Sequence, residues 1–226
     1  MQSQTQKYLF VEHLPLLQEG FQNAINHISE NTTTIRFQGS EIKRSDDFGV
    51  SIAQLLEDSS AINFIWLNMD FPIPSQDKHN PFSIASTLMK THPEARILIT
   101  LQQATVYALR KIFQKINPHV VLELVDCDQQ TIIKSLIAII HKEIFYSKTI
   151  LLLLHKFLQT FEAMDNADYA ILHELDKGAP VTHLPKKVLL SHSTILTRRT
   201  QLKTLFNLSG KTDADLLREV KRQGYI

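Results

Sequence analysis

The stretch Ile62–Pro72, INFIWLNMDFP, is the most informative in the chain. Its first six residues, Ile62–Leu67, are almost all apolar, and polar residues follow at once. A short apolar run without alternation is typical of a strand that is buried on both faces, as in a parallel sheet. We therefore interpret Ile62–Leu67 as a central strand with polar side chains at its carboxyl end.

Outward from this stretch, strand-like and helical patterns alternate. Four further strands are predicted at Lys7–Val11, Thr33–Gln38, Arg96–Leu101 and Val120–Val125. Helices with apolar residues three and four apart are predicted at 14–28, 50–56, 84–89, 104–115 and 129–141. Five strands in alternation with five helices predict an α/β fold, a parallel sheet covered on both faces. In such sheets the crevice that binds ligands lies at the carboxyl ends of the strands.

Four stretches resemble the receiver domain of bacterial response regulators in order and spacing. They are Val11–Phe21, Ile62–Pro72, His92–Thr100 and Asp128–Ile140. The resemblance implies a flavodoxin-like receiver domain at residues 1–146. A working receiver of that family holds Mg²⁺ with two acids, phosphorylates an aspartate, and carries a Thr or Ser and a Lys nearby.

The family's reactive positions have changed in this chain. The acid pair falls on Glu12 and His13, the phosphoacceptor on Asn68 and the lysine on Val125, or on Glu123 if the register slips by two. Thr100 supplies the hydroxyl. Mg²⁺ prefers several oxygen ligands, and an amide cannot serve as the nucleophile towards phosphorus. We predict a degenerate receiver that is not phosphorylated. The competing hypothesis takes Asp70 as the acceptor and needs a shifted loop.

A linker helix is predicted after the receiver, at residues 147–163. Its core, Thr149–Met164, is apolar nearly all round. One interpretation is a helix that bridges two domains and packs on both sides; the other is a dimer contact. The sequence does not separate them.

The last sixty residues predict four short helices. The first begins at Asp165 with an Asp165–Asp168 capping box and ends before Gly178. The second covers Val181–Leu190, the third follows Ser191 as N-cap and covers His192–Phe206, and the fourth covers Asp213–Gln223. This arrangement predicts an all-α, four-helix helix-turn-helix domain at residues 164–226.

The spacing resembles the NarL/LuxR-type DNA-binding domain. The matching positions are Ile171, Leu172, Leu175, Gly178, Leu184, Val188, Leu190, Ser191, Thr194, Ile195, Leu202 and Phe206. Pro185 and Arg198 depart from the family, and Pro185 puts a straight second helix in doubt. The resemblance implies that double-stranded DNA is a partner and that a homodimer binds paired half-sites.

The third helix is expected to enter the major groove. On a helical wheel, Ile195, Leu202 and Phe206 share the core face and polar residues lie opposite. We predict base contacts from Leu196, Thr197 and Thr200, with Ser193 and Thr194 at the same interface. We predict phosphate contacts from Lys186, Lys187, Arg198, Arg199 and Lys203. The alternative is that these charges form a solvated face.

The net charge of +1 conceals two different halves. Residues 1–162 carry a net charge of −2 and residues 163–226 carry +3. From Lys177 to Thr212 there are seven basic residues and no Asp or Glu. The basic charge therefore gathers around the predicted recognition helix.

Other site classes find little support in the sequence. One cysteine, Cys127, excludes an internal disulfide, and we interpret it as a small packed residue. We expect no metal, no cofactor and no enzymatic activity. The sequence has no pair of histidines four residues apart, as in H-E-x-x-H, and no P-loop or Gly-rich nucleotide loop. No apolar run is long enough to span a membrane, so we expect a cytoplasmic protein.

These features together predict a transcriptional regulator of the response-regulator type. Two rivals stay open. One is an interaction protein whose receiver and helix-turn-helix folds bind protein rather than DNA. The other is a regulator whose receiver senses a small ligand in the old phosphorylation crevice.

Overall fold

The computed structural model describes residues 4–32, 34–42, 61–70, 80–160 and 163–226. These residues form two compact units, which we describe separately. The sheet unit comprises residues up to 103 and 111–151, and the helical unit comprises residues 104–110 and 152–226.

The described residues of the sheet unit form six parallel strands. They are β1 (Gln4–Val11), β2 (Ile35–Ile42), β3 (Phe64–Asn68), β4 (Arg96–Leu101), β5 (Val120–Glu123) and β6 (Phe145–Tyr146). Their order is β2-β1-β3-β4-β5-β6, and every neighbouring pair is parallel. The order reverses direction between β1 and β3, so the ends of these two strands define the crevice of the fold.

The sixth strand differs from the five-strand prediction. Phe145 and Tyr146 pair with Val120 and Val121 of β5, whereas the predicted sheet ended at β5. Two residues are too short to show a strand pattern, so only the packing against β5 reveals this strand. Tyr146 also packs edge-on against Phe113, with ring centroids 5.4 Å apart.

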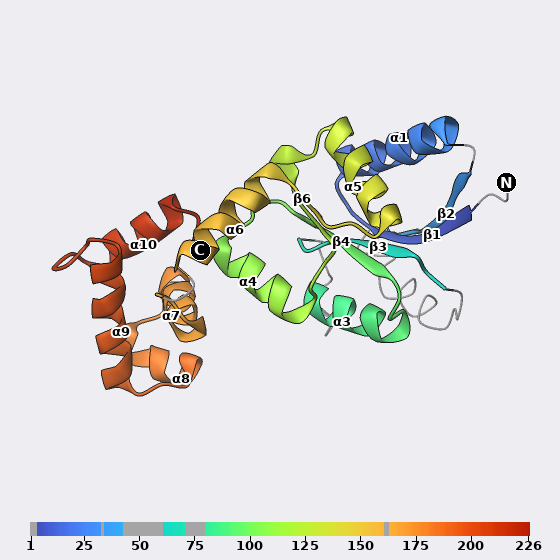
Figure 1. Cartoon of the computed structure of the whole chain (residues 1–226). Helices are drawn as coiled ribbons and strands as arrows, with labels where there is room; N and C mark the ends of the chain where they lie inside the picture. Colours follow the sequence, from blue (N-terminus) through green and yellow to red (C-terminus); the bar gives the residue numbers. More distant parts are fainter. Residues whose placement is uncertain (1–3, 33, 43–60, 71–79, 161–162) are drawn as a thin grey trace. The chain divides into compact units, whose positions relative to one another are not determined.

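Helices cover both faces of the sheet (Figure 1). Helices α1 (Pro15–Asn31) and α5 (Gln129–His141) lie together on one face, and α3 (Pro81–Thr91) and α4 (Val106–Lys115) lie on the other. The helix predicted at 50–56 lies outside the described residues. No helix among the described residues is long and apolar enough to cross a membrane.

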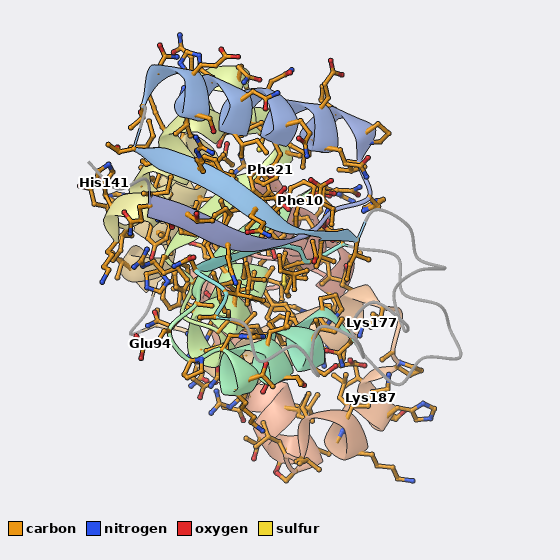
Figure 2. The ribbon with its side chains drawn as sticks, turned by 90° about the vertical axis from the view of Figure 1, so that its right-hand side faces the viewer. Phe10, Phe21, Glu94, His141, Lys177 and Lys187 are labelled. Carbon is orange, nitrogen blue, oxygen red and sulfur yellow. The ribbon has the colours of Figure 1, made fainter. Side chains whose placement is uncertain are left out.

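Aromatic side chains fill the core between α1 and the sheet. Phe10 of β1 stacks on Phe21 of α1 at 4.2 Å between ring centroids, and both are fully buried (Figure 2). Trp66 of β3 meets Phe21 edge-on at 5.5 Å. The burial of several large rings at one site supplies much of the hydrophobic stabilisation of this unit.

Helix α6 (Lys148–Thr160) corresponds to the predicted linker helix, and residues 161–162 of that prediction lie outside the described residues. Ile150 and Leu153 are buried, whereas Leu151, Leu152 and Leu158 are exposed. One side of the helix is therefore buried, and a second apolar side is exposed. A bridge between domains and a dimer contact both stay predictions for this helix.

The helical unit contains four further helices. They are α7 (Asn166–Asp176), α8 (Leu184–Val188), α9 (His192–Leu205) and α10 (Asp213–Arg222). Ile171, Leu175, Leu184 and Ile195 form its buried core. All four are positions at which the sequence resembles the DNA-binding family. These matching positions therefore pack against one another in the core of the unit.

The second predicted helix is divided. A 3₁₀ turn, Val181–His183, precedes the short α8, and Pro185 lies in the first turn of α8. Proline is tolerated in a first turn because its missing N–H has no helical partner there. Leu189 then adopts a left-handed φ of 56° and ends the helix before Ser191.

Candidate functional site

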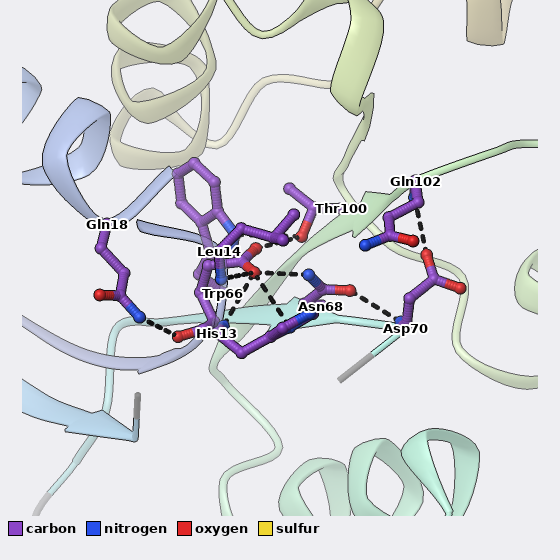
Figure 3. Close-up of polar contacts among 9 residues, drawn as sticks. His13, Leu14, Gln18, Trp66, Asn68, Asp70, Thr100 and Gln102 are labelled. Atoms are coloured by element: carbon purple, nitrogen blue, oxygen red, sulfur yellow. Dashed lines mark hydrogen bonds and ion pairs between the residues drawn. The ribbon is translucent and has the colours of Figure 1, made fainter. Parts of the chain in front are cut away.

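The crevice of the sheet unit is built around Glu12. The carboxylate follows β1 directly and is fully buried. Register places Asn68 of β3 beside Thr100 of β4, and both are buried as well. Three of the five predicted crevice residues, Glu12, Asn68 and Thr100, therefore meet in one network (Figure 3).

Neutral donors occupy both oxygens of the Glu12 carboxylate. Oε1 accepts from the backbone N–H groups of His13 at 2.9 Å and Leu14 at 3.1 Å, and from Nδ2 of Asn68 at 2.5 Å. Oε2 accepts from Oγ1 of Thr100 at 3.0 Å. A buried carboxylate needs such bonds because it has lost its water. Here the bonds come from the protein itself, with three donors at Oε1 and one at Oε2.

Asn68 uses both ends of its amide. Nδ2 donates to Glu12, and Oδ1 accepts from the backbone N–H of Asp70 at 2.7 Å. Asp70 Oδ2 in turn accepts from the backbone N–H of Gln102 at 2.7 Å. The Asp70 carboxylate thus joins the loop after β3 to the loop after β4, a contact the sequence did not reveal.

The other two predicted crevice residues take different positions. His13 Nδ1 lies 3.6 Å from Glu12 Oε1, so its ring borders the network. Val125 lies in a 3₁₀ turn, Leu124–Asp126, with 77% of its side chain exposed. It contributes nothing to the network. Among the described residues, no group of three His, Cys, Asp or Glu side chains is placed to hold a metal ion.

Cys127 follows this turn. Its Sγ donates to the backbone oxygen of Glu123 at 3.3 Å. Burial, then the negative charges of Asp126 and Glu12, raise the pKa of the thiol to about 12. The thiolate, which is the reactive form, is therefore rare at neutral pH.

The second candidate site is the exposed face of α9. Ser191 caps the helix by accepting from the N–H of Thr194 at 3.1 Å, as predicted. Ile195 and Leu202 are buried, as the wheel predicted. The exposed residues of α9 are His192, Ser193, Leu196, Thr197, Thr200, Gln201, Thr204 and Leu205. This face borders a groove of about 880 Å³.

The threonines of this face use their hydroxyl protons within the helix. Oγ1 of Thr197 donates to the carbonyl of Ser193, and Oγ1 of Thr200 donates to that of Leu196, each at 3.1 Å. Towards an external partner these residues present an accepting oxygen and a methyl group.

Most of the predicted basic cluster is paired with acids inside the unit. Lys187 and Lys177, labelled in Figure 2, both pair with Glu174, at 2.6 and 3.5 Å. Lys203 Nζ lies 2.9 Å from Asp213, which also binds Arg199. The segment 177–212 contains no acid, but its partners lie just outside it.

Arg198 of α9 binds the residues that begin α7. Its Nη1 lies 2.8 Å from Asp165 and 3.0 Å from Asp168, the two members of the predicted capping box, which the structure confirms. Burial raises the pKa of Asp168, while hydrogen bonds outweigh burial at Asp165 and lower its pKa. Of the seven basic residues from Lys177 to Thr212, only Lys186 and Lys211 have no ion pair among the described residues.

Comparison with solved structures identifies the fold. The two-component response regulator RcsB, in complex with DNA, superposes with a TM-score of 0.62 at 15% identity, over 96% of this chain and 98% of that chain. This chain has the two-domain fold of response regulators. RcsB from Salmonella enterica serovar Typhimurium, bound to the promoter rprA, gives 0.55 at 13% identity, over 96% of this chain and 99% of that chain.

A third similar structure is described as a member of the LuxR family. The LuxR-family two-component response regulator from Aurantimonas gives a TM-score of 0.50 at 14% identity, over 68% of this chain and 97% of that chain. No family model matches the sequence, and no curated protein matches it. The likeness at these identities is one of fold.

Proposed function

We propose that the protein is a DNA-binding transcriptional regulator. The observation that carries this proposal is the exposed face of α9. Its accepting oxygens and methyl groups are complementary to the amino groups and thymine methyl groups that a major groove presents. Thr197 and Thr200 would accept from the amino groups of adenine or cytosine, and Leu196 would contact thymine methyl groups. The proposal is supported by the similarity in fold to RcsB, which is described in complex with DNA. Residues 164–226 would form the DNA-binding domain.

The proposed phosphate contacts come from the basic residues flanking this face. Lys186 would reach a phosphate directly. Lys187 would reach one after leaving Glu174, a partner it holds on an exposed surface. Arg198, Arg199 and Lys203 were also predicted to contact phosphates, but carboxylates of their own unit bind them, so we expect these three to contribute little. Ser193 and Thr194, at the start of α9, would lie beside the backbone, where helix N-termini favour phosphate.

We further propose that residues 1–146 form a receiver that works without aspartyl phosphorylation, joined by the linker at 147–163. The occupied Glu12 carboxylate and the Asn68 amide support this proposal. Two RcsB dimers are described on two parallel DNAs, and by analogy we propose that this chain binds paired half-sites as a homodimer.

Two experiments test the parts of this proposal separately. Selection from a random duplex pool with the full chain should enrich one sequence, and Thr200→Ala should relax the preference at one base pair while changing affinity for random DNA little. Failure to enrich any sequence would refute DNA recognition. Incubation with acetyl phosphate and Mg²⁺ should leave the intact mass unchanged; an adduct of one phosphoryl group on Asp70 would refute phosphate-independent action.

One observation favours the rival in which the helical unit binds protein. The exposed face of α9 carries no Asp, Glu, Lys or Arg, and Leu196, Leu205 and the adjacent Leu189 are exposed. DNA binding rises steeply as salt is lowered, whereas protein docking on such an uncharged face does not. Salt dependence of binding therefore separates the two functions.

A further inference from the structure

Asp213 holds two cations of the candidate recognition helix at once. It is the first residue of α10, and Arg199 and Lys203 come from the last turns of α9. Arg199 Nη2 binds Asp213 Oδ2, and Lys203 Nζ lies 2.9 Å from Oδ1. The two cations thus share one carboxylate, one on each oxygen.

These three side chains are largely withdrawn from water. The exposed fractions are 17% for Arg199, 18% for Lys203 and 23% for Asp213. Burial raises the pKa of Asp213, but the hydrogen bonds and charges of Lys203 and Arg199 outweigh it and hold the pKa below its usual range. Asp213 is therefore ionised at neutral pH and remains a competitor for both cations.

The other ion pairs of the unit differ from this one. Lys187, paired with Glu174, has 47% of its side chain exposed, and such pairs are weak and exchange readily. Arg198 is bound by the capping box of α7. Only at Asp213, among the described residues, do two cations of α9 share a single, mostly buried carboxylate.

A phosphate that approaches Arg199 or Lys203 must compete with the Asp213 carboxylate for their positive charge. Each phosphate neutralised by a protein cation steepens the fall of affinity with salt, by about 0.9 in the slope of log K against log salt. A cation already neutralised by a carboxylate adds little to this term. We propose that Asp213 acts as an internal counter-anion that withholds Arg199 and Lys203 from DNA phosphates. It thereby lowers non-specific affinity and leaves discrimination to the neutral face of α9.

This inference rests on the proposed DNA-binding function, and the test uses the full chain with a random-sequence 30-base-pair duplex. Asp213→Asn keeps the size of the side chain and removes its charge. Asp176→Asn is the matched control, because it removes the same charge from a carboxylate that pairs at 2.6 Å with Lys221 of α10, away from α9. Circular dichroism checks that each variant is folded.

Asp213→Asn should bind the random duplex about tenfold more tightly than wild type at 0.1 M salt, with a slope steeper by up to about 2. Asp176→Asn should stay within about threefold of wild type, since only its net charge has changed. Equal gains in both variants would show a general effect of net charge and would overturn the inference. An unchanged slope in folded Asp213→Asn would overturn it too.

Lys203→Gln provides a second, independent measurement. In wild type it should change random-duplex affinity less than about twofold, whereas in the Asp213→Asn background it should lower affinity severalfold, because additivity fails for groups that compete. If Asp213→Asn does not fold, Lys203→Gln alone still decides, since a tenfold loss in wild type would show that Lys203 already contacts DNA. The proposed function fails separately, if selection enriches no sequence.

Discussion

At the scale of single residues, Asn68 holds the crevice of the sheet unit together. An amide has one donating and one accepting end, and both are used, towards Glu12 and towards the N–H of Asp70. An aspartate in the same place could accept from Asp70 but could not donate to Glu12 unless it were protonated. The amide at position 68 is therefore one of the four donors that satisfy the buried Glu12 carboxylate.

Asn68→Asp should destabilise the protein in a pH-dependent way. Glu12 would raise the pKa of the new carboxyl in the folded state above its unfolded value of about 3.9. Below that value the aspartate is protonated in both states and the deficit is small; as the pH rises towards the folded pKa, the deficit grows. We expect a loss of about 1–3 kcal/mol at pH 7.5, measured by urea unfolding.

The control for this variant is Asn26→Asp, which adds the same charge to the exposed side of α1. It should change the free energy of unfolding at pH 7.5 by less than about 0.5 kcal/mol. A wild-type urea midpoint for Asn68→Asp at pH 7.5 would show that the bond from Asn68 to Glu12 contributes nothing.

Cys127 should be slow to react in the folded protein. Its pKa of about 12 leaves little thiolate at pH 8. We expect iodoacetamide to modify it at least about a hundredfold more slowly than in protein unfolded with guanidinium, followed by mass spectrometry. Similar rates in the two states would contradict the burial and the negative surroundings of this thiol.

At the scale of elements, helix boundaries in the helical unit follow their capping residues. Asp165, Ser191 and Thr212 cap α7, α9 and α10 through side-chain oxygens that accept from backbone N–H groups. These signals are local, and two of the three, at Asp165 and Ser191, were predicted from sequence. The division of the second helix was indicated by Pro185, but the left-handed turn at Leu189 was not.

Arg198 joins α9 to the start of α7, so its loss should affect two elements. Arg198→Ala leaves Asp165 and Asp168 close together without their cation, and we expect the helical unit to lose about 1–3 kcal/mol by urea unfolding. Arg218→Ala is the control, because Arg218 is 78% exposed and pairs with Asp215 one turn away in the same helix. Equal effects of the two variants would contradict a role for Arg198 in holding α7.

At the scale of the whole molecule, two units with separate cores carry opposite net charges. The sheet unit is centred on Phe10, Phe21 and Trp66, and the helical unit on Ile171 and Ile195. Most of the basic side chains around α9 are paired with acids of the same unit. Four acidic residues there bind five of the seven basic residues from Lys177 to Thr212. Counting charge along the chain therefore overstates the free positive charge at α9.

Separate cores predict separate responses to substitution. Trp66 is the only tryptophan and is buried in the sheet unit, so its fluorescence reports that unit. Asn68→Asp should shift the fluorescence midpoint in urea, and Arg198→Ala should shift helical circular dichroism while leaving that midpoint in place. A shift of both signals in both variants would show that the units unfold as one.

The sequence by itself determined most of the alternation of strands and helices, the caps at Asp165 and Ser191, and the buried positions Ile171, Leu175, Leu184 and Ile195 of the helical unit. These features depend on neighbours a few residues apart, where periodicity and capping are visible. Tertiary structure alone decided the pairing of β6, the donors around Glu12 and the partners of Arg198, Arg199 and Lys203. Apart from the backbone donors of His13 and Leu14, those contacts join residues from 10 to 88 positions apart, and no local pattern encodes which distant acid or amide a side chain will meet.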